Sequence, residues 1–119
     1  MNKKVLIIDD DPTILEAIKL TLELEDYKTQ TVSDCEKAIE ISKTYIPDVI
    51  LLDLLLSGNN GCSIAKELKE ETETKNIPII MISAHPNAKN MAKLAGADDF
   101  IAKPFDIDDL LNIVKKHAK

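Results

Sequence analysis

Four short runs of apolar residues constrain the fold of this chain more than any other feature. The runs lie at residues 5–8, 49–52, 79–82 and 100–102, and the first three are rich in branched residues that do not alternate with polar ones. Strands that are buried on both faces of a parallel sheet have this composition. A fifth segment, residues 28–32, alternates weakly and is therefore expected at an edge of the sheet.

Segments with helical periodicity separate these runs. The apolar stripes are Ile14, Ile18 and Leu22; Ala38, Ile41 and Tyr45; Ile64 and Leu68; Met91 and Ala95; Leu110 and Val114. Pro12 behind Asp11 suits a capped helix start, and Gly96 suits a left-handed helix end. Five strand–helix units in a row predict an α/β fold: a doubly wound, flavodoxin-like, five-stranded parallel sheet of order 2-1-3-4-5 with helices on both faces.

Length and charge narrow the function. The 119 residues suffice for one domain, expected over residues 1–119, and no apolar run approaches a membrane span. Two cysteines 27 positions apart do not form a disulfide framework, which favours a reducing cytoplasm. The net charge is −6 and every cation is lysine, so the basic face and the arginines of a duplex-reading domain are absent. Direct nucleic-acid binding is not expected.

Polar residues follow the apolar runs at the points where each strand should end. Parallel strands bring their carboxyl ends to one edge of the sheet, where ligands bind in folds of this kind. The residues expected to meet there are Asp9, Asp10 and Asp11 after the first run, Asp53 after the second, Ser83 after the third and Lys103 after the fourth.

Such a group of carboxylates needs a counter-charge. Two like charges about 4 Å apart repel by about 4 kcal/mol at an effective dielectric constant near 20. All-oxygen ligands suit Mg²⁺, with Mn²⁺ possible. Asp53 interrupts an apolar run, so a structural role explains it poorly. With a cation, Lys103 and Ser83 beside it, its carboxylate has the surroundings of a nucleophile in phosphoryl transfer. Asp11 is interpreted as a helix cap.

Four motifs, in order along the chain, resemble the receiver domain of two-component response regulators. They are V-L-I-I-D-D-D-P at 5–12, D-L-L-L-S-G-N-N-G at 53–61, I-I-M-I-S-A at 79–84 and G-A-D-D-F-I-A-K-P-F at 96–105. The chain is therefore identified as a member of this family, similar to the chemotaxis-regulator type.

The resemblance implies a phosphoacceptor signalling domain that is not an enzyme towards other substrates and catalyses only its own phosphorylation and dephosphorylation. Asp53 would be the modified residue, accepting a phosphoryl group from a histidine kinase or phosphotransfer protein. Asp10, Asp53 and the main-chain carbonyl of Leu55 would bind Mg²⁺ directly, and Asp9 mostly through water.

The resemblance also implies a switch. Ser83 would move towards the phosphoryl oxygens, Phe100 would change its packing, and Lys103 would pair with the phosphate ahead of a cis Lys103–Pro104 bond. The repacked face, formed by the last two helices and the last strand, would dock a downstream protein, and the protein would be a monomer or weak dimer. The phosphate donor would dock near the first helix and the acidic rim.

Some positions depart from the family pattern. Ser57 stands where proline is usual, Asn60 where aspartate is common, and Phe100 where tyrosine is more frequent. None of them touches the phosphorylation chemistry. Leu55 and His85 occupy variable positions that in this family affect the lifetime of the phosphoryl group, and their bulk is expected to slow the approach of water.

Alternative interpretations stay open at this point. Residues 9–13 satisfy D-x-D-x-T, the nucleophile motif of haloacid-dehalogenase-type phosphatases, which would use Asp9 and leave Asp53 without a role. The chain is interpreted as a stand-alone receiver because it begins at Met1, and the alternative is a fragment of a longer regulator with an output domain. Cys35 and Cys62 are expected to be packed residues, and His117 to be solvated at the negative end of the last helix.

Overall fold

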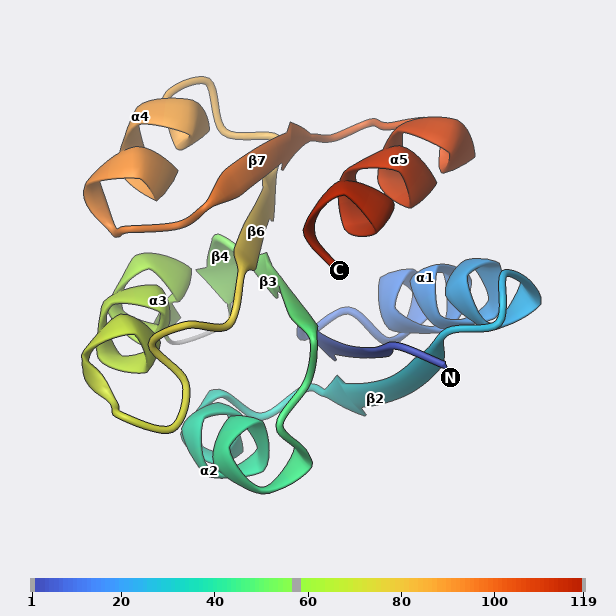
Figure 1. Ribbon diagram of the computed structural model, residues 1–119. Coiled ribbons are helices and arrows are strands. Elements are labelled where there is room, and N and C mark those ends of the chain that lie inside the picture. The colour runs from blue at the N-terminus through green and yellow to red at the C-terminus, as the bar shows by residue number, and fades with distance from the viewer. Residues whose placement is uncertain (1, 57–58, 119) are drawn as a thin grey trace.

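A computed structural model describes residues 2–56 and 59–118, and for Cys35, residues 55, 56 and 59–62 it describes the backbone only. Five parallel strands form one sheet of order β2-β1-β3-β6-β7 (Figure 1). Their bounds are β1 Lys4–Ile8, β2 Lys28–Val32, β3 Val49–Asp53, β6 Ile79–Ser83 and β7 Asp99–Ala102. The predicted order 2-1-3-4-5 is confirmed, with the weakly alternating strand at one edge.

Five helices cover the two faces of this sheet. They are α1 Pro12–Leu24, α2 Cys35–Tyr45, α3 Gly61–Glu70, α4 Ala88–Leu94 and α5 Ile107–His117. Figure 1 shows α1 and α5 on one face and α2, α3 and α4 on the other. The prediction of a flavodoxin-like α/β fold is therefore confirmed. No helix within the described ranges is both long enough and apolar enough to cross a bilayer.

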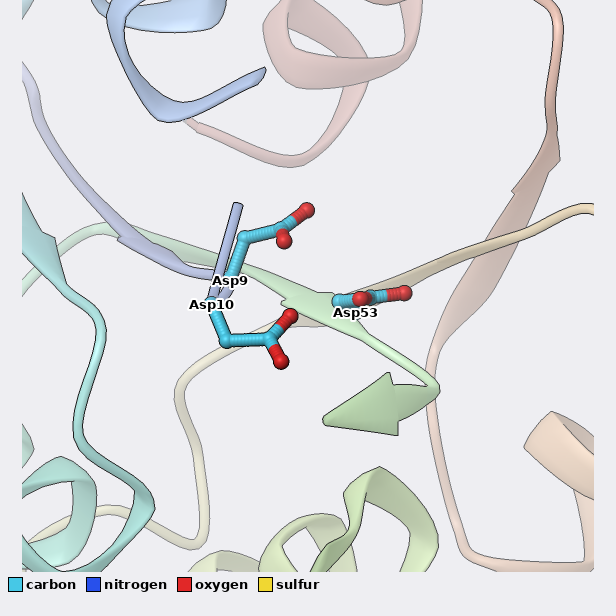
Figure 2. Close-up of side chains that lie close together, drawn as sticks. All are labelled: Asp9, Asp10 and Asp53. Carbon is cyan, nitrogen blue, oxygen red and sulfur yellow. The ribbon is translucent and has the colours of Figure 1, made fainter. Parts of the chain in front are cut away.

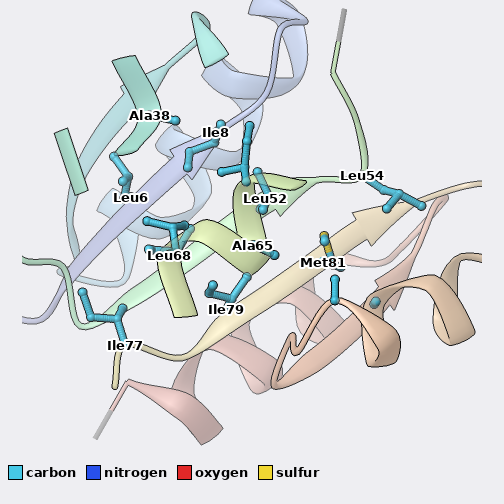
Figure 3. Packing of buried hydrophobic residues seen from close by; sticks show 14 of the residues in the cluster. Leu6, Ile8, Ala38, Leu52, Leu54, Ala65, Leu68, Ile77, Ile79 and Met81 are labelled. Carbon is cyan, nitrogen blue, oxygen red and sulfur yellow. The ribbon is translucent and has the colours of Figure 1, made fainter. Parts of the chain in front are cut away.

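Alternate residues of the central strands enter two separate core layers, as the period of a β-strand requires. Leu6, Leu52 and Met81 pack with the helices α2, α3 and α4 (Figure 3). Ile7, Leu51 and Ile80 point to the other face and pack with α1 and α5. Burial of both faces explains why these three strands contain no alternating polar residues.

The helix ends agree with the expected capping residues. The Asp11 side chain accepts hydrogen bonds from the N–H groups of Thr13 and Ile14, at 2.9 and 3.5 Å, which confirms its role as the cap of α1. Gly96, two residues beyond α4, has a φ of +86°, a conformation that costs a residue with a Cβ about 1–2 kcal/mol.

A short hairpin was not predicted from the sequence. Strands β4 (Leu55–Leu56) and β5 (Asn59–Asn60) pair antiparallel just after β3. Each strand has two residues, too short for periodicity to reveal. Ser57, a departure from the family pattern, lies outside the described residues. So do the side chains of Asn60, another departure, and of Leu55, a variable position.

Candidate functional site

Three aspartates come together where two central strands end. Strands β1 and β3 are adjacent and parallel, and Ile8 lies opposite Leu52 in their register. Asp53 is the last residue of β3, while Asp9 and Asp10 follow β1 directly. Figure 2 shows the three side chains at this common edge of the sheet. The juxtaposition expected from the strand ends is therefore present.

The carboxylates lie close enough to share one cation. One oxygen from each of Asp9, Asp10 and Asp53 lies within 4.8 Å of the others. Asp9 and Asp53 are only 2% and 6% exposed. Asp11, the fourth aspartate of the predicted edge, is not part of this cluster and caps α1 instead.

In the described part of the chain, Asp9 is the member of the cluster with an unsatisfied buried oxygen. Its Oδ1 accepts a hydrogen bond of 2.9 Å from the main-chain N–H of Asp11. Its Oδ2 is buried and has no hydrogen-bond partner among the described residues. A buried charged oxygen without a hydrogen bond is costly. Its position beside two other carboxylates suits an oxygen-binding divalent cation such as Mg²⁺.

Lys103 brings an ammonium group within salt-bridge distance of two of these carboxylates. It follows β7, and its Nζ lies 3.7 Å from Asp9 Oδ2 and 3.7 Å from Asp53 Oδ1. Its main-chain N–H donates to the carbonyl of Ser83, at 3.0 Å, and a cis peptide bond joins it to Pro104. One lysine opposite three carboxylates leaves the site with excess negative charge.

Ser83 and His85 lie at the end of β6 and in the loop just after it. Ser83 is the buried last residue of β6, next to β3 in the sheet. Its Oγ accepts a hydrogen bond of 2.9 Å from the N–H of His85. The Nδ1 of His85 accepts one of 3.0 Å from the N–H of Asn87. These main-chain donors hold the loop after β6 around the serine hydroxyl.

Phe100 and Leu55, the other two predicted site residues, lie in β7 and β4. Phe100 is in β7, half-buried and packed against the core layer of α2, α3 and α4. Leu55 begins β4, two residues after Asp53, and its side chain is outside the described part of the chain.

Two contact networks at the opposite edge of the sheet, where β6 and β7 begin, were missed by sequence reasoning. Asp98 accepts hydrogen bonds from the main-chain N–H of Ile79 and from Lys69 Nζ, at 2.8 and 2.6 Å. The expectation that His117 is solvated was wrong, because its side chain is 17% exposed and its Nε2 lies 2.7 Å from Asp99 Oδ2. Neither network has a local signal, because the partners are 18 to 29 positions apart.

A triad of aspartates, two of them buried, with a facing lysine at the carboxyl edge of a 2-1-3-4-5 sheet is typical of phosphoacceptor signalling domains. The family model described as "Response regulator receiver domain" matches residues 5–115. The chain therefore belongs to the response regulator receiver family, a phosphoacceptor module of two-component signalling.

Several known proteins are similar to the chain. RpaA of Synechocystis sp., a DNA-binding dual master transcriptional regulator, is 33% identical over 114 residues, covering 94% of this chain and 47% of that protein. The chain spans about half the length of the curated relatives it matches.

Solved structures agree with this fold. The chemotaxis response regulator CheY4 of Vibrio cholerae has a TM-score of 0.90 and 27% identity, covering 98% of both chains. The receiver domain of the sensor histidine kinase PA1611 of Pseudomonas aeruginosa PAO1 has a TM-score of 0.90 and 26% identity, covering 99% of this chain and 98% of that one. That structure has a magnesium ion coordinated in its active site cleft.

Proposed function

We propose that Asp53 accepts a phosphoryl group from a phosphohistidine donor in a reaction that depends on Mg²⁺. The observation that carries this proposal is the carboxylate cluster of Asp9, Asp10 and Asp53, with Lys103 3.7 Å from its two buried members. The magnesium ion reported for the PA1611 receiver supports the choice of cation.

In the proposed step, a carboxylate oxygen of Asp53 attacks phosphorus. A P–O bond forms while the P–N bond to the donor imidazole breaks, and the imidazole keeps the bonding pair and takes up a proton. A bound Mg²⁺ would neutralise negative charge on the phosphoryl oxygens. Lys103 offsets part of the same charge, and Ser83 turns its hydroxyl towards the new phosphoryl oxygens as a hydrogen-bond donor.

Asp9, Asp10, Asp53 and the main-chain carbonyl of Leu55 are the proposed holders of the cation. Asp9 and Asp10 have little freedom to move away from Asp53, because the strand before them, β1, lies between two neighbours in the sheet. Because the strands already hold these ligands in place, little free energy is needed to order them when the cation binds.

Output is proposed to pass through a protein surface. Phosphorylation adds nearly two negative charges and new acceptor oxygens beside Ser83 and Lys103. Ser83 is joined to Lys103 by a main-chain hydrogen bond of 3.0 Å, and Lys103 lies three residues after Phe100. This path supports Phe100 as the residue that alters the face of α4, β7 and α5 for a downstream protein. Histidine kinases or phosphotransfer proteins are the proposed donors, docking near α1, and the domain is proposed to be a monomer or weak dimer in the cytoplasm.

The intact mass of the protein after treatment with acetyl phosphate and Mg²⁺ tests the chemistry. We expect the wild-type protein to gain the mass of one phosphoryl group and Asp53→Asn to gain none. Asp26→Asn is the matched control, because it makes the same change in the exposed turn after α1 and should react as the wild type does. Circular dichroism verifies that each variant is folded.

The same experiment separates the receiver from the phosphatase alternative. A phosphatase that uses Asp9 requires that Asp9→Asn alone abolish the mass gain. The receiver requires that Asp53→Asn abolish it and that Asp9→Asn only slow it. A full mass gain in Asp53→Asn would refute the proposal.

Whether the receiver acts alone or within a longer regulator is a separate part of the proposal. The full coverage of CheY4 supports a stand-alone receiver, while the half coverage of RpaA supports a domain followed by an output module. An antibody against this domain, used on an extract of the native cells, should detect a band of about the 13.2 kDa of this chain for the first and a much larger one for the second.

A further inference from the structure

Outside the acidic site, a histidine and an aspartate join the last helix to an edge strand. Asp99 is the first residue of β7, and His117 is the last residue of α5. The Nε2 of His117 lies 2.7 Å from Asp99 Oδ2. The imidazole is mostly buried, whereas the neighbouring Lys116 has a side chain that is 70% exposed.

The electrostatics of Asp99 show an ionised carboxylate at this contact. Partial burial alone would raise its pKa. The hydrogen bond from His117, the hydrogen bond from the Phe100 N–H and the charges of His117 and Lys116 together hold the pKa of Asp99 below its usual value. Both His117 and Lys116 come from the last turn of α5, where the negative end of the helix dipole favours positive charge.

Asp99 also contacts the strand itself. Its Oδ1 accepts a hydrogen bond of 2.9 Å from the main-chain N–H of Phe100. Strand β7 has a single neighbour, β6, with Phe100 opposite Met81. An edge strand has fewer main-chain hydrogen bonds than a central one. A side-chain contact at its first residue therefore contributes more to keeping the strand in the sheet.

We propose that His117 and Asp99 form a protonation-dependent clasp that ties the end of α5 to strand β7 beside Phe100. The clasp uses no residue of the acidic site and does not depend on phosphorylation of Asp53. The protonated imidazole makes a charge-assisted hydrogen bond with the carboxylate. The neutral imidazole retains at most a hydrogen bond to the carboxylate, without the attraction between two full opposite charges. The end of α5 then opens more often.

The pH range of the clasp follows from the two groups. Asp99 has a lowered pKa, so its contribution is present above the pKa of an unfolded aspartate and is lost as the pH falls through the folded value. Histidine is the side chain whose charge changes between about pH 5 and 8 in proteins generally, and this range contains the upper limit of the proposed clasp. The clasp is therefore strongest in mildly acid solution and weakens towards pH 8. Lys116, 3.6 Å from the same oxygen, keeps its charge over this range and does not switch.

Amide hydrogen exchange on the full chain tests the proposal. Protection factors of residues 114–118 and of Phe100 are measured at pH 6 and pH 8, relative to Leu51 in the central strand β3 as a reporter of global opening. We expect relative protection at these positions to fall by about fivefold between the two pH values, the loss typical of a helix-end imidazolium contact.

Three variants and a control make the test specific. His117→Gln and Asp99→Asn should have low protection that does not change with pH. His117→Arg keeps a permanent cation and should have high protection at both pH values. Lys116→Gln is the matched control, since it removes the exposed neighbouring cation and should retain the pH dependence of the wild type.

Two results would overturn the proposal. One is relative protection in the wild type that is the same at pH 6 and pH 8. The other is a pH-dependent loss in His117→Gln as large as in the wild type, which would place the responsible group elsewhere. The wild-type measurement needs no variant, so the first result decides even if a variant fails to fold.

Discussion

At the residue scale, Asp9 is the side chain whose negative charge is least compensated by its surroundings. It is almost fully buried, it lies against two other carboxylates, and one of its oxygens has no hydrogen-bond partner among the described residues. In the described part of the chain its one ion-pair partner is Lys103, at 3.7 Å. Evolution for stability alone would not favour this arrangement, because an uncompensated buried charge opposes folding. A residue that costs stability in this way is typical of a functional site.

Asp9→Asn should therefore stabilise the protein when no divalent cation is present. Removal of one of three crowded charges is expected to raise the free energy of unfolding by about 1–2 kcal/mol. Urea unfolding in the presence of EDTA measures this change. Asp11→Asn is the control, because it removes a neighbouring charge while asparagine still caps α1, and it should change stability by less than about 0.5 kcal/mol. A lower stability for Asp9→Asn would contradict the charge-crowding argument.

At the element scale, Asp98 joins three parts of the fold that lie apart in the sequence. Its Oδ2 accepts hydrogen bonds from the N–H of Ile79, at the start of β6, and from Lys69 in α3. Lys69 Nζ also donates to the carbonyl of Ile77, at 3.0 Å. The aspartate itself lies in the turn between α4 and β7. The motif that identifies the family thus contains a structural acid beside Asp99.

Replacement of Asp98 should separate its two contacts. Asp98→Ala leaves a part-buried N–H of Ile79 unpaired and should lower the free energy of unfolding by about 2 kcal/mol. Asp98→Asn keeps an acceptor for that N–H and loses only a partly exposed ion pair, so about 1 kcal/mol or less is expected. Thermal and urea unfolding measure both variants. Equal losses would show that the ion pair, and not the main-chain hydrogen bond, dominates.

At the scale of the whole molecule, the sheet and its two core layers hold the acidic residues together. Asp9 and Asp10 follow one central strand and Asp53 ends the next, and both strands are buried on both faces. The carboxylates cannot move apart without disturbing the core. Charge repulsion at the edge is therefore coupled to the stability of the entire domain.

Addition of Mg²⁺ should accordingly raise the stability of the whole domain. A ligand that binds only the folded state adds RT ln(1 + [L]/Kd), which is about 2.7 kcal/mol at a hundredfold excess over Kd. The urea midpoint should rise on addition of MgCl₂, with no change in the slope of the transition. NaCl at matched ionic strength controls for screening. Asp53→Asn should lose most of the Mg²⁺ effect, and an equal rise in NaCl would contradict a bound cation.

Much of this architecture was predictable because its signals are local or periodic. Branched apolar runs identified the buried strands, apolar stripes identified the helices, and the polar residue after each run marked a strand end. The two-residue strands β4 and β5 were missed because they are shorter than any period. The surroundings of His117 were also missed, because a histidine near the end of a helix has the same local sequence whether it faces solvent or an aspartate.

The order of residues by itself determined the fold class, the strand order and the set of candidate site residues, since burial on both faces and helical periodicity are properties of short segments. The tertiary structure alone decided how those residues meet: that Asp9 has a buried oxygen with no hydrogen-bond partner among the described residues, and that Asp99 pairs with His117. The physical reason is that charge balance and burial depend on distances between side chains far apart along the chain, and these distances exist only once the strands are packed side by side.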